Sequence, residues 1–289
     1  MANLRDIRRR IKSAKNIQQI TRAMKFVSAA RLRRAQERVI AARPYAKQIT
    51  DVLKSLAERV PEEAHPLLAH KENVEKIELV VITADRGMCG AYNTNIIRNA
   101  LEFLGRHSDK KVELNILGKR GRDFFRRRPY PVRSEAVNVL QNLTFADAAA
   151  IAKTLIDDFC NGEKDEIWLL YNEFKSVVQQ RIVCERLLPI ARIESLEGRN
   201  PENESALEYI YDEPPEKIFA GLLPRYIEAQ VFRALLEASA SEHGARMSAM
   251  EAATNNAAEM IDGLTLYANK IRQAGITREL IEVVSGAGQ

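Results

Sequence analysis

The feature that most restricts the fold of this chain is a long repeating pattern of apolar residues near its C-terminal end. Steps of three and four residues, taken alternately, lead from Leu222 to Ala274 and meet mostly apolar side chains. The positions are Leu222, Arg225, Ala229, Phe232, Leu236, Ser239, His243, Arg246, Met250, Ala253, Ala257, Met260, Leu264, Tyr267, Ile271 and Ala274. This spacing is typical of a helix that supercoils around a partner. A helix on the order of 100 Å long needs a partner helix, because no single-domain core could cover it.

The partner helix is predicted at the other end of the chain. The same steps lead from Leu4 to Val60, and thirteen of the seventeen positions are apolar. The pattern continues beyond Pro44, which predicts a kink there rather than the end of the helix. An antiparallel pair is favoured, in which facing residue numbers add up to about 276, so that Leu4 meets the neighbourhood of Arg272. The last turns, 273–289, would then extend as a single helix. Two unrelated helices on the surface of a bundle are the alternative.

A second apolar stripe lies beside the first on the N-terminal helix. It consists of Ile17, Ile20, Met24 and Val27. At the same place the main pattern turns polar, with Gln18, Thr21, Lys25 and Ser28. A helix that is apolar on two faces contacts more than one partner. A local shift of the register, called a stutter, explains the same residues equally well.

The charges are distributed unevenly. Residues 1–59 hold sixteen Lys or Arg and four Asp or Glu, a net charge of +12, whereas the whole chain carries +5, so the remainder carries −7. Such a basic helix implies an acidic or phosphate-rich neighbour. The three cysteines, Cys89, Cys160 and Cys184, have no close spacing, which indicates a reduced, intracellular protein. No apolar run approaches the roughly 20 residues of a membrane span.

The middle of the chain has a different character. Short apolar runs predict strands at 77–83, 112–117, 166–171 and 177–187. Helices are predicted at 93–106, in a short stretch that follows Gly118-Lys119-Arg120-Gly121 and ends at Arg128, and at 145–160, the last capped by Thr144. This alternation favours a Rossmann-like α/β domain with a mainly parallel sheet, inserted between the paired helices of a long antiparallel coiled coil. The predicted boundaries are a coiled-coil helix at 1–60, a linker at 61–73, the α/β domain at 74–193, a connector at 194–215 and a second coiled-coil helix at 216–289.

The glycine-containing turns do not match the known phosphate-binding motifs. The turn at 85–90 has glycines only at Gly87 and Gly90 and lacks the dinucleotide fingerprint, although its amides could hold a phosphate. Gly118-Lys119 lacks the first glycine and the hydroxyl residue of a phosphate loop. A structural turn is therefore the preferred interpretation at both places.

Reactive side chains are also isolated. Cys89 lies close to Arg86, which favours a thiolate, but no histidine is near it in sequence. His65 and His70 have no cysteine or carboxylate cluster to complete a metal site. His243 falls among apolar neighbours and is interpreted as a packing residue. We therefore expect no catalytic residue, no cofactor and no metal.

Three stretches of the sequence together resemble one protein family. They are Ile11-Lys12-Ser13 with Ile20-Thr21-Arg22-Ala23-Met24-Lys25; Thr83-Ala84-Asp85-Arg86-Gly87-Met88-Cys89-Gly90; and Arg246-Met247-x-Ala249-Met250 with Ala274-Gly275-Ile276-Thr277-Arg278-Glu279 and Val284-Ser285-Gly286-Ala287. On these residues the whole chain resembles the gamma subunits of bacterial F-type ATP synthases. Gln289 departs from the family pattern, in which a small or basic residue is expected at that position. This difference concerns only the last residue of the chain.

The resemblance implies a non-catalytic rotor subunit. In this family the paired helices form a shaft inside a ring of three alpha and three beta subunits, and the beta subunits hold the ATP sites. The α/β domain lies near the epsilon subunit and the membrane c ring, which proton flow turns. The resemblance thus implies torque transmission and a peripheral position on the cytoplasmic face of the bacterial cell membrane. It implies neither membrane insertion nor nucleic-acid binding.

The resemblance also assigns partner contacts to seven positions. Those expected to contact the beta subunits are Arg272, Gln273 and Thr277, at loops of beta, and Met24 and Arg246, near an acidic lever of beta. Those expected near the c ring or epsilon are Tyr209 and Tyr211. For each position, a solvated or packing residue is the alternative.

Two other functions are compatible with parts of the sequence. A basic coiled coil that binds nucleic acid would use the N-terminal helix, but the apolar pattern runs through the basic segment, and Phe26 is the only aromatic residue among the first 44. An α/β nucleotide enzyme with a helical arm is disfavoured by the missing phosphate motifs.

Overall fold

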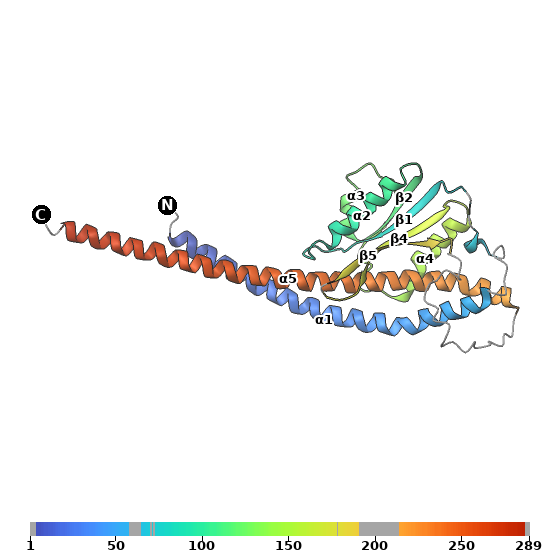
Figure 1. Cartoon of the computed structure of the whole chain (residues 1–289), viewed down its shortest axis with the longest axis horizontal. Helices are drawn as coiled ribbons and strands as arrows, with labels where there is room; N and C mark the ends of the chain where they lie inside the picture. The colour runs from blue at the N-terminus through green and yellow to red at the C-terminus, as the bar shows by residue number, and fades with distance from the viewer. Residues whose placement is uncertain are drawn as a thin grey trace. The chain divides into compact units, whose positions relative to one another are not determined.

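The computed structural model describes residues 4–57, 65–69, 71, 73–177, 179–190 and 214–286. Its internal contacts divide the chain into two units, one made of Met1–Ala30 with Arg246–Gln289 and the other of Arg31–Ala245. Two long helices contribute to both units: α1 (Leu4–Ala57) and α5 (Pro215–Gly286), drawn in blue and in orange to red in Figure 1. The helix α1 continues through Pro44, in agreement with the prediction from the apolar pattern that it does not end there.

In the first unit, α1 and α5 form an antiparallel pair. The hydroxyl of Thr254 donates a hydrogen bond of 2.8 Å to the hydroxyl of Thr21, and Lys25 Nζ lies 2.6 Å from Glu251 Oε1. The residue numbers in these two contacts add up to 275 and 276. The predicted direction and register of the pair are thereby confirmed.

The buried side of α1 follows the predicted pattern, whereas that of α5 departs from it. Every described pattern position from Leu4 to Leu53 is buried or half-buried. On α5, Met260 and Tyr267 were expected in the contact but are 60% and 47% exposed, and the next residues, Ile261 and Ala268, are half-buried instead. A helix turns once in about 3.6 residues, so its contact line drifts toward later residues than a strict 3.5 repeat predicts.

The end of α5 extends beyond the pair, as predicted. All described side chains from Arg272 to Ser285 are exposed. They include four large apolar residues with exposed fractions from 50% to 68%, namely Ile276, Leu280, Ile281 and Val283. An isolated helix of this kind has an apolar surface that α1 does not cover.

The second unit contains a five-stranded sheet with the order β3-β2-β1-β4-β5. The strands are β1 (Lys76–Ile82), β2 (Lys111–Leu117), β3 (Val132–Ala136), β4 (Glu166–Phe174) and β5 (Gln180–Leu188). The first four are parallel, and β5 is antiparallel to β4, which confirms the Rossmann-like prediction. The strand β3 was not predicted, because an edge strand needs no apolar face. All five of its residues are exposed or half-buried.

The helices of this unit agree with the sequence pattern. They are α2 (Tyr92–Arg106), α3 (Lys119–Phe125), α4 (Phe145–Cys160) and a short 3-10 helix, η2 (Pro66–Leu68), in the segment predicted as a linker. Thr144 caps α4 with a reciprocal pair of hydrogen bonds to Asp147, as expected from the sequence. The main apolar core lies between the sheet and α2 and α3. It includes Leu79, Ile116, Ile96, Phe103 and Phe125.

Polar side chains of β1 and β2 form a buried pair, close to an ion pair between β3 and α4. Glu78 is fully buried and accepts a hydrogen bond of 3.1 Å from Asn115 Nδ2. Its other oxygen, Oε2, has no hydrogen-bond partner among the described atoms. Burial raises the pKa of the Glu78 carboxyl above its ordinary value, and the bond from Asn115 opposes part of that rise. Nearby, Arg133 binds Asp158 through bonds of 2.6 and 2.8 Å.

Candidate partner-binding surface

The polar section of the helix pair remains inside the contact between α1 and α5. Thr21 and Ser28 are only 9% and 3% exposed, and their hydroxyls donate to backbone carbonyls of the preceding turn, of Gln18 and Met24 respectively. The second apolar stripe is exposed at the same level: Ile17 is 52%, Ile20 59% and Val27 53% exposed. Because the main contact stays in phase, the stripe is a second face and not the result of a stutter.

The two positions assigned to the acidic lever differ in their exposure. Met24, within the apolar stripe, is half-buried. Arg246 is only 6% exposed and already interacts within the chain. In this conformation the Arg246 guanidinium therefore does not face solvent, in keeping with its place in the apolar pattern of the helix pair.

The three positions near the C-terminal end are accessible. Arg272, Gln273 and Thr277 are exposed on the single-helix part of α5. Gln273 and Thr277 are one turn apart on the same face, and the Thr277 hydroxyl donates a hydrogen bond of 3.0 Å to the carbonyl of Gln273. Tyr209 and Tyr211, the positions assigned to the c ring or epsilon, lie outside the described residues.

The turn after β1 is held by internal hydrogen bonds. The Asp85 carboxylate accepts from the backbone N–H groups of Lys119 and Asn138, at 3.0 and 2.9 Å. The Asn93 side chain accepts from Ala84 N at 2.9 Å and donates to the sulfur of Cys89, which is 2% exposed. These contacts support the structural interpretation of the turn.

The helix α5 crosses the place where Rossmann-like domains usually bind nucleotides. That place lies at the carboxyl ends of strands on either side of the switch in strand order, here β1 and β4. Tyr92 follows the turn after β1, and its hydroxyl donates a hydrogen bond of 3.1 Å to Ala238 O. Phe174 ends β4, and its backbone N–H donates a bond of 3.0 Å to Glu237 Oε2. The protein's own helix therefore contacts the end of β4 and the start of α2, the helix that follows β1.

A second set of contacts joins α5 to the β4–β5 pair. Arg233, one turn before Glu237, binds Glu185 on β5 with an N–O distance of 2.8 Å. The same Glu185 oxygen accepts the hydroxyl of Tyr171 on β4 at 3.0 Å. Burial raises the pKa of Tyr171, which therefore remains a hydrogen-bond donor at neutral pH. We call Arg233, Glu237, Phe174, Glu185 and Tyr171 the α5 junction.

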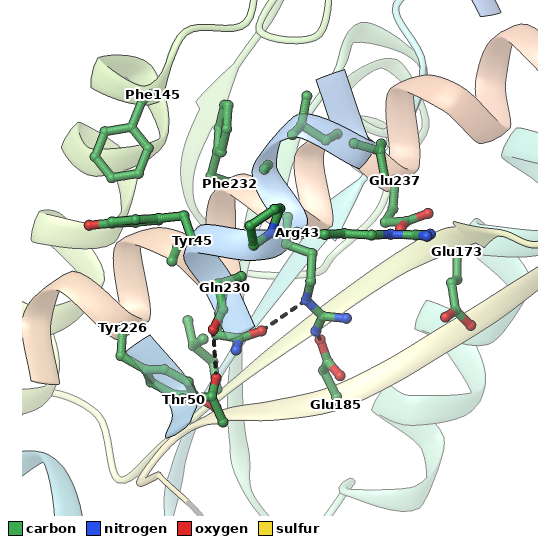
Figure 2. Close-up of a pocket in the computed structure, with 18 of the residues that line it drawn as sticks. Arg43, Tyr45, Thr50, Phe145, Glu173, Glu185, Tyr226, Gln230, Phe232 and Glu237 are labelled. Atoms are coloured by element: carbon green, nitrogen blue, oxygen red, sulfur yellow. Dashed lines mark hydrogen bonds and ion pairs between the residues drawn. The ribbon is translucent and has the colours of Figure 1, made fainter. Parts of the chain in front are cut away.

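A cavity of about 1160 Å³ lies beside the α5 junction (Figure 2). Arg43 and Tyr45 of α1 line it, together with Tyr226 and Phe232 of α5 and Phe145 at the start of α4. Rings of Tyr45 and Phe145, and of Phe145 and Phe232, pack edge to face. Sequence patterns did not single out the α5 junction. The only signal was a pair of charged residues, Arg233 and Glu237, one turn apart within an apolar stretch.

Neither a metal site nor a membrane span is found in the described part of the chain. No three His, Cys, Asp or Glu side chains there are grouped so as to hold a metal ion. His65 instead caps η2, where its Nδ1 accepts from Leu67 N at 3.2 Å. None of the described helices has a stretch that is long and apolar enough to cross a bilayer.

Comparison with known proteins identifies the family. The family model described as ATP synthase matches residues 3–288. The ATP synthase gamma chain of Solibacter usitatus is 50% identical, and that of Desulfitobacterium hafniense 47%, each over 99% of both chains. A chain of the Tetrahymena thermophila mitochondrial ATP synthase central stalk and c-ring structure is 28% identical, with a TM-score of 0.62 over 81% of this chain and 99% of its own. A chain of the Euglena gracilis mitochondrial ATP synthase rotor, 19% identical, shares the fold with a TM-score of 0.67 over 94% and 98%. This chain belongs to the ATP synthase gamma-chain family.

Proposed function

We propose that the chain is the central-stalk rotor subunit of a proton-translocating bacterial ATP synthase. It transmits torque between a membrane c ring and a catalytic ring of three alpha and three beta subunits. The observation that carries this proposal is the antiparallel helix pair, in which α5 extends alone past Arg272 with exposed apolar side chains. A helix pair with an uncovered apolar end needs a surrounding partner.

The proposed role in ordering the nucleotide sites follows from the asymmetry of the pair. A ligand or partner shifts a conformational equilibrium only through different contacts with the different states. One side of α1 presents the apolar stripe with Ile17 and Ile20, whereas the end of α5 presents Arg272 and Gln273 among apolar residues. Three equivalent beta subunits around such a pair meet three different surfaces, so each beta subunit is biased toward a different conformation.

We expect this subunit to be non-catalytic, with ATP bound and converted on the beta subunits. Support comes from the contacts of Tyr92 and Phe174 with α5, which fill the place where an α/β domain of this kind would hold a nucleotide. The basic residues in the first 59 positions suit an acidic partner surface. Met24, Arg272, Gln273 and Thr277 are the proposed beta contacts, and Arg246 joins them after a change of its side-chain position.

The remaining partners are proposed from the family. The α/β domain is expected to contact the epsilon subunit and the c ring, with Tyr209 and Tyr211 near that contact. The complex would then place this chain on the cytoplasmic face of the bacterial membrane without inserting it into the lipid. We propose no cofactor and no nucleic-acid partner.

The proposal is tested by reconstitution. The purified chain alone should neither hydrolyse ATP nor bind it in a calorimetric titration. Its addition to the other subunits should restore ATP-driven proton pumping in vesicles, at one copy per three beta subunits. Intrinsic ATP turnover by the isolated chain, or equal pumping by a complex without it, would contradict the proposal.

A further inference from the structure

The α5 junction is the place where strands of the sheet are bound to a long helix. Arg233, Glu237 and Gly244 are spaced so that they lie along one face of α5, over about three turns. Arg233 reaches β5 through Glu185, and Glu237 reaches the end of β4 through the backbone of Phe174. These two contacts bind α5 to the adjacent strands β4 and β5, so the helix is attached to the sheet at two points.

The helix also approaches Phe174 closely at Gly244. A Cβ atom at Gly244 would lie 3.1 Å from Cε2 of Phe174, which is tighter than an ordinary contact. Glu237 is 7% exposed, and its bond to Phe174 N replaces the water that a carboxylate otherwise needs. A displacement of α5 would therefore leave a buried charge without its donor, and the joint resists displacement.

The helix α1 has a weaker connection to the sheet. Its described polar contact with the α/β domain is from Arg38 to the carbonyl of Leu143, in the segment that leads into α4. Its ring contact is from Tyr45 to Phe145, at the start of α4. Beside the α5 junction, the cavity lies between residues of α1, such as Arg43, and residues of β5 and α5, such as Glu185 and Arg233. The contacts of Arg233 and Glu237 bind α5 directly to the strands.

We infer that the α5 junction is the mechanical joint through which torque passes between the α/β domain and the helix pair, with Glu237 as its principal positioning residue. This inference rests on the proposed rotor function and goes beyond it by assigning the route of the force. Glu237 holds Phe174 in place, and Arg233 holds Glu185. Weakening the joint allows the helices to turn without the domain, so that hydrolysis continues while pumping is lost.

The test uses the complete ATP synthase in liposomes, with Glu237→Ala in this subunit. ATP hydrolysis and ATP-driven acidification are measured on the same preparation, after the content of the subunit has been matched to wild type. The number of protons pumped per ATP hydrolysed should fall by about threefold or more. This is the size of effect that mutations between two coupled sites have on the coupling. Glu237→Gln, whose amide oxygen can still accept from Phe174 N, should restore most of the coupling. Glu228→Ala removes a carboxylate from the same helix outside the junction and should leave the ratio unchanged.

A merely structural role predicts a different result. Glu237→Ala would then lower the subunit content and the hydrolysis rate together, with an unchanged ratio of protons to ATP in the complexes that assemble. If too little of that variant assembles, Gly244→Ala provides the second measurement, since its added methyl displaces the Phe174 ring by a few tenths of an ångström. In that case, an unchanged ratio in Gly244→Ala would overturn the inference, whereas a lowered ratio supports it. A normal ratio of protons to ATP in fully assembled Glu237→Ala overturns the inference about the α5 junction and leaves the proposed rotor function intact. Pumping at the wild-type rate by a complex that lacks this chain contradicts the proposed rotor function itself.

Discussion

Lys25 Nζ lies 2.6 Å from the carboxylate of Glu251, although the two residues are 226 positions apart in the chain. One helical turn along α1, Thr21 meets Thr254. Polar contacts inside an apolar helix pair favour one register over its alternatives, because a shift would leave them unpaired. The polar section thus specifies how the two ends of the chain align.

Reversing one charge of this ion pair should weaken the helix pair slightly. The side chains of Lys25 and Glu251 are 32% and 51% exposed, so water screens their attraction. We expect a coupling energy of about 0.2–1 kcal/mol in a double-mutant cycle of Lys25→Glu and Glu251→Lys. The double variant should regain most of the stability lost by either single variant in urea unfolding. Additive losses would contradict a direct contact.

Gly118→Ala should strongly destabilise the α/β domain. Gly118 has a φ of 107°, and a Cβ atom there would lie 2.1 Å from the carbonyl oxygen of Thr83. The added strain and backbone clash should lower the free energy of unfolding by about 3 kcal/mol or more, measured by urea unfolding. Gly105→Ala is the matched control, since no atom lies within 4 Å of its Cβ position, and this variant should be at least as stable as wild type.

The buried Glu78 should make stability depend on pH. Burial raises the pKa of this carboxyl above 4.5, so the folded state favours the protonated form. Its favourable contribution is complete below pH 4.5 and is lost as the pH rises through the raised pKa, at about 1.4 kcal/mol per unit of pKa difference. Glu78→Gln removes this titration.

The measurement for Glu78 is urea unfolding of both proteins from pH 4 to pH 8. Glu78→Gln should gain stability relative to wild type as the pH rises, and the difference should become constant once Glu78 is fully ionised. A difference that is independent of pH, or that favours wild type increasingly at higher pH, would show that the carboxylate is stabilised by its neighbours more than burial penalises it.

Met24→Lys should weaken coupling more than hydrolysis. Met24 lies half-buried within the exposed apolar stripe, so an added ammonium group would bind an acidic beta surface too strongly and delay its release. The measurement is the ratio of proton pumping to ATP hydrolysis in reconstituted vesicles. Gln48→Lys adds the same charge at an exposed position of α1 and should have a smaller effect. Equal coupling in Met24→Lys and wild type would remove Met24 from the proposed contact.

The sequence predicts the helix pair well because its signal is repeated many times. An error at one step of α1 is corrected by the next, and all described positions from Leu4 to Leu53 agree. A strict repeat of 3.5 residues does not account for the gradual shift of the contact line along a helix with about 3.6 residues per turn. Met260 and Tyr267 were therefore predicted in the contact instead of Ile261 and Ala268. The strand β3 was missed because its five residues carry no apolar alternation to detect.

The site was less predictable than the fold. Exposure of Gln273 and Thr277 follows from their place beyond the pair, and the pattern was sufficient to find it. The burial of Arg246 agrees with its place in the apolar pattern, although a contact with a partner subunit requires its side chain to be accessible. The α5 junction depends on Glu237 meeting a backbone N–H 63 residues earlier, and such a contact leaves no local pattern.

The uncovered end of α5 has a consequence for the cell that makes this protein. In any copy that is not yet bound by its partner subunits, the apolar side chains at this end are exposed to water; they are Ile276, Leu280, Ile281 and Val283. Exposed apolar helices associate with one another. Surplus copies are therefore a hazard, so production has to keep pace with the supply of enclosing subunits. In a strain that overproduces only this chain, aggregates and induction of chaperones are the expected signs of imbalance.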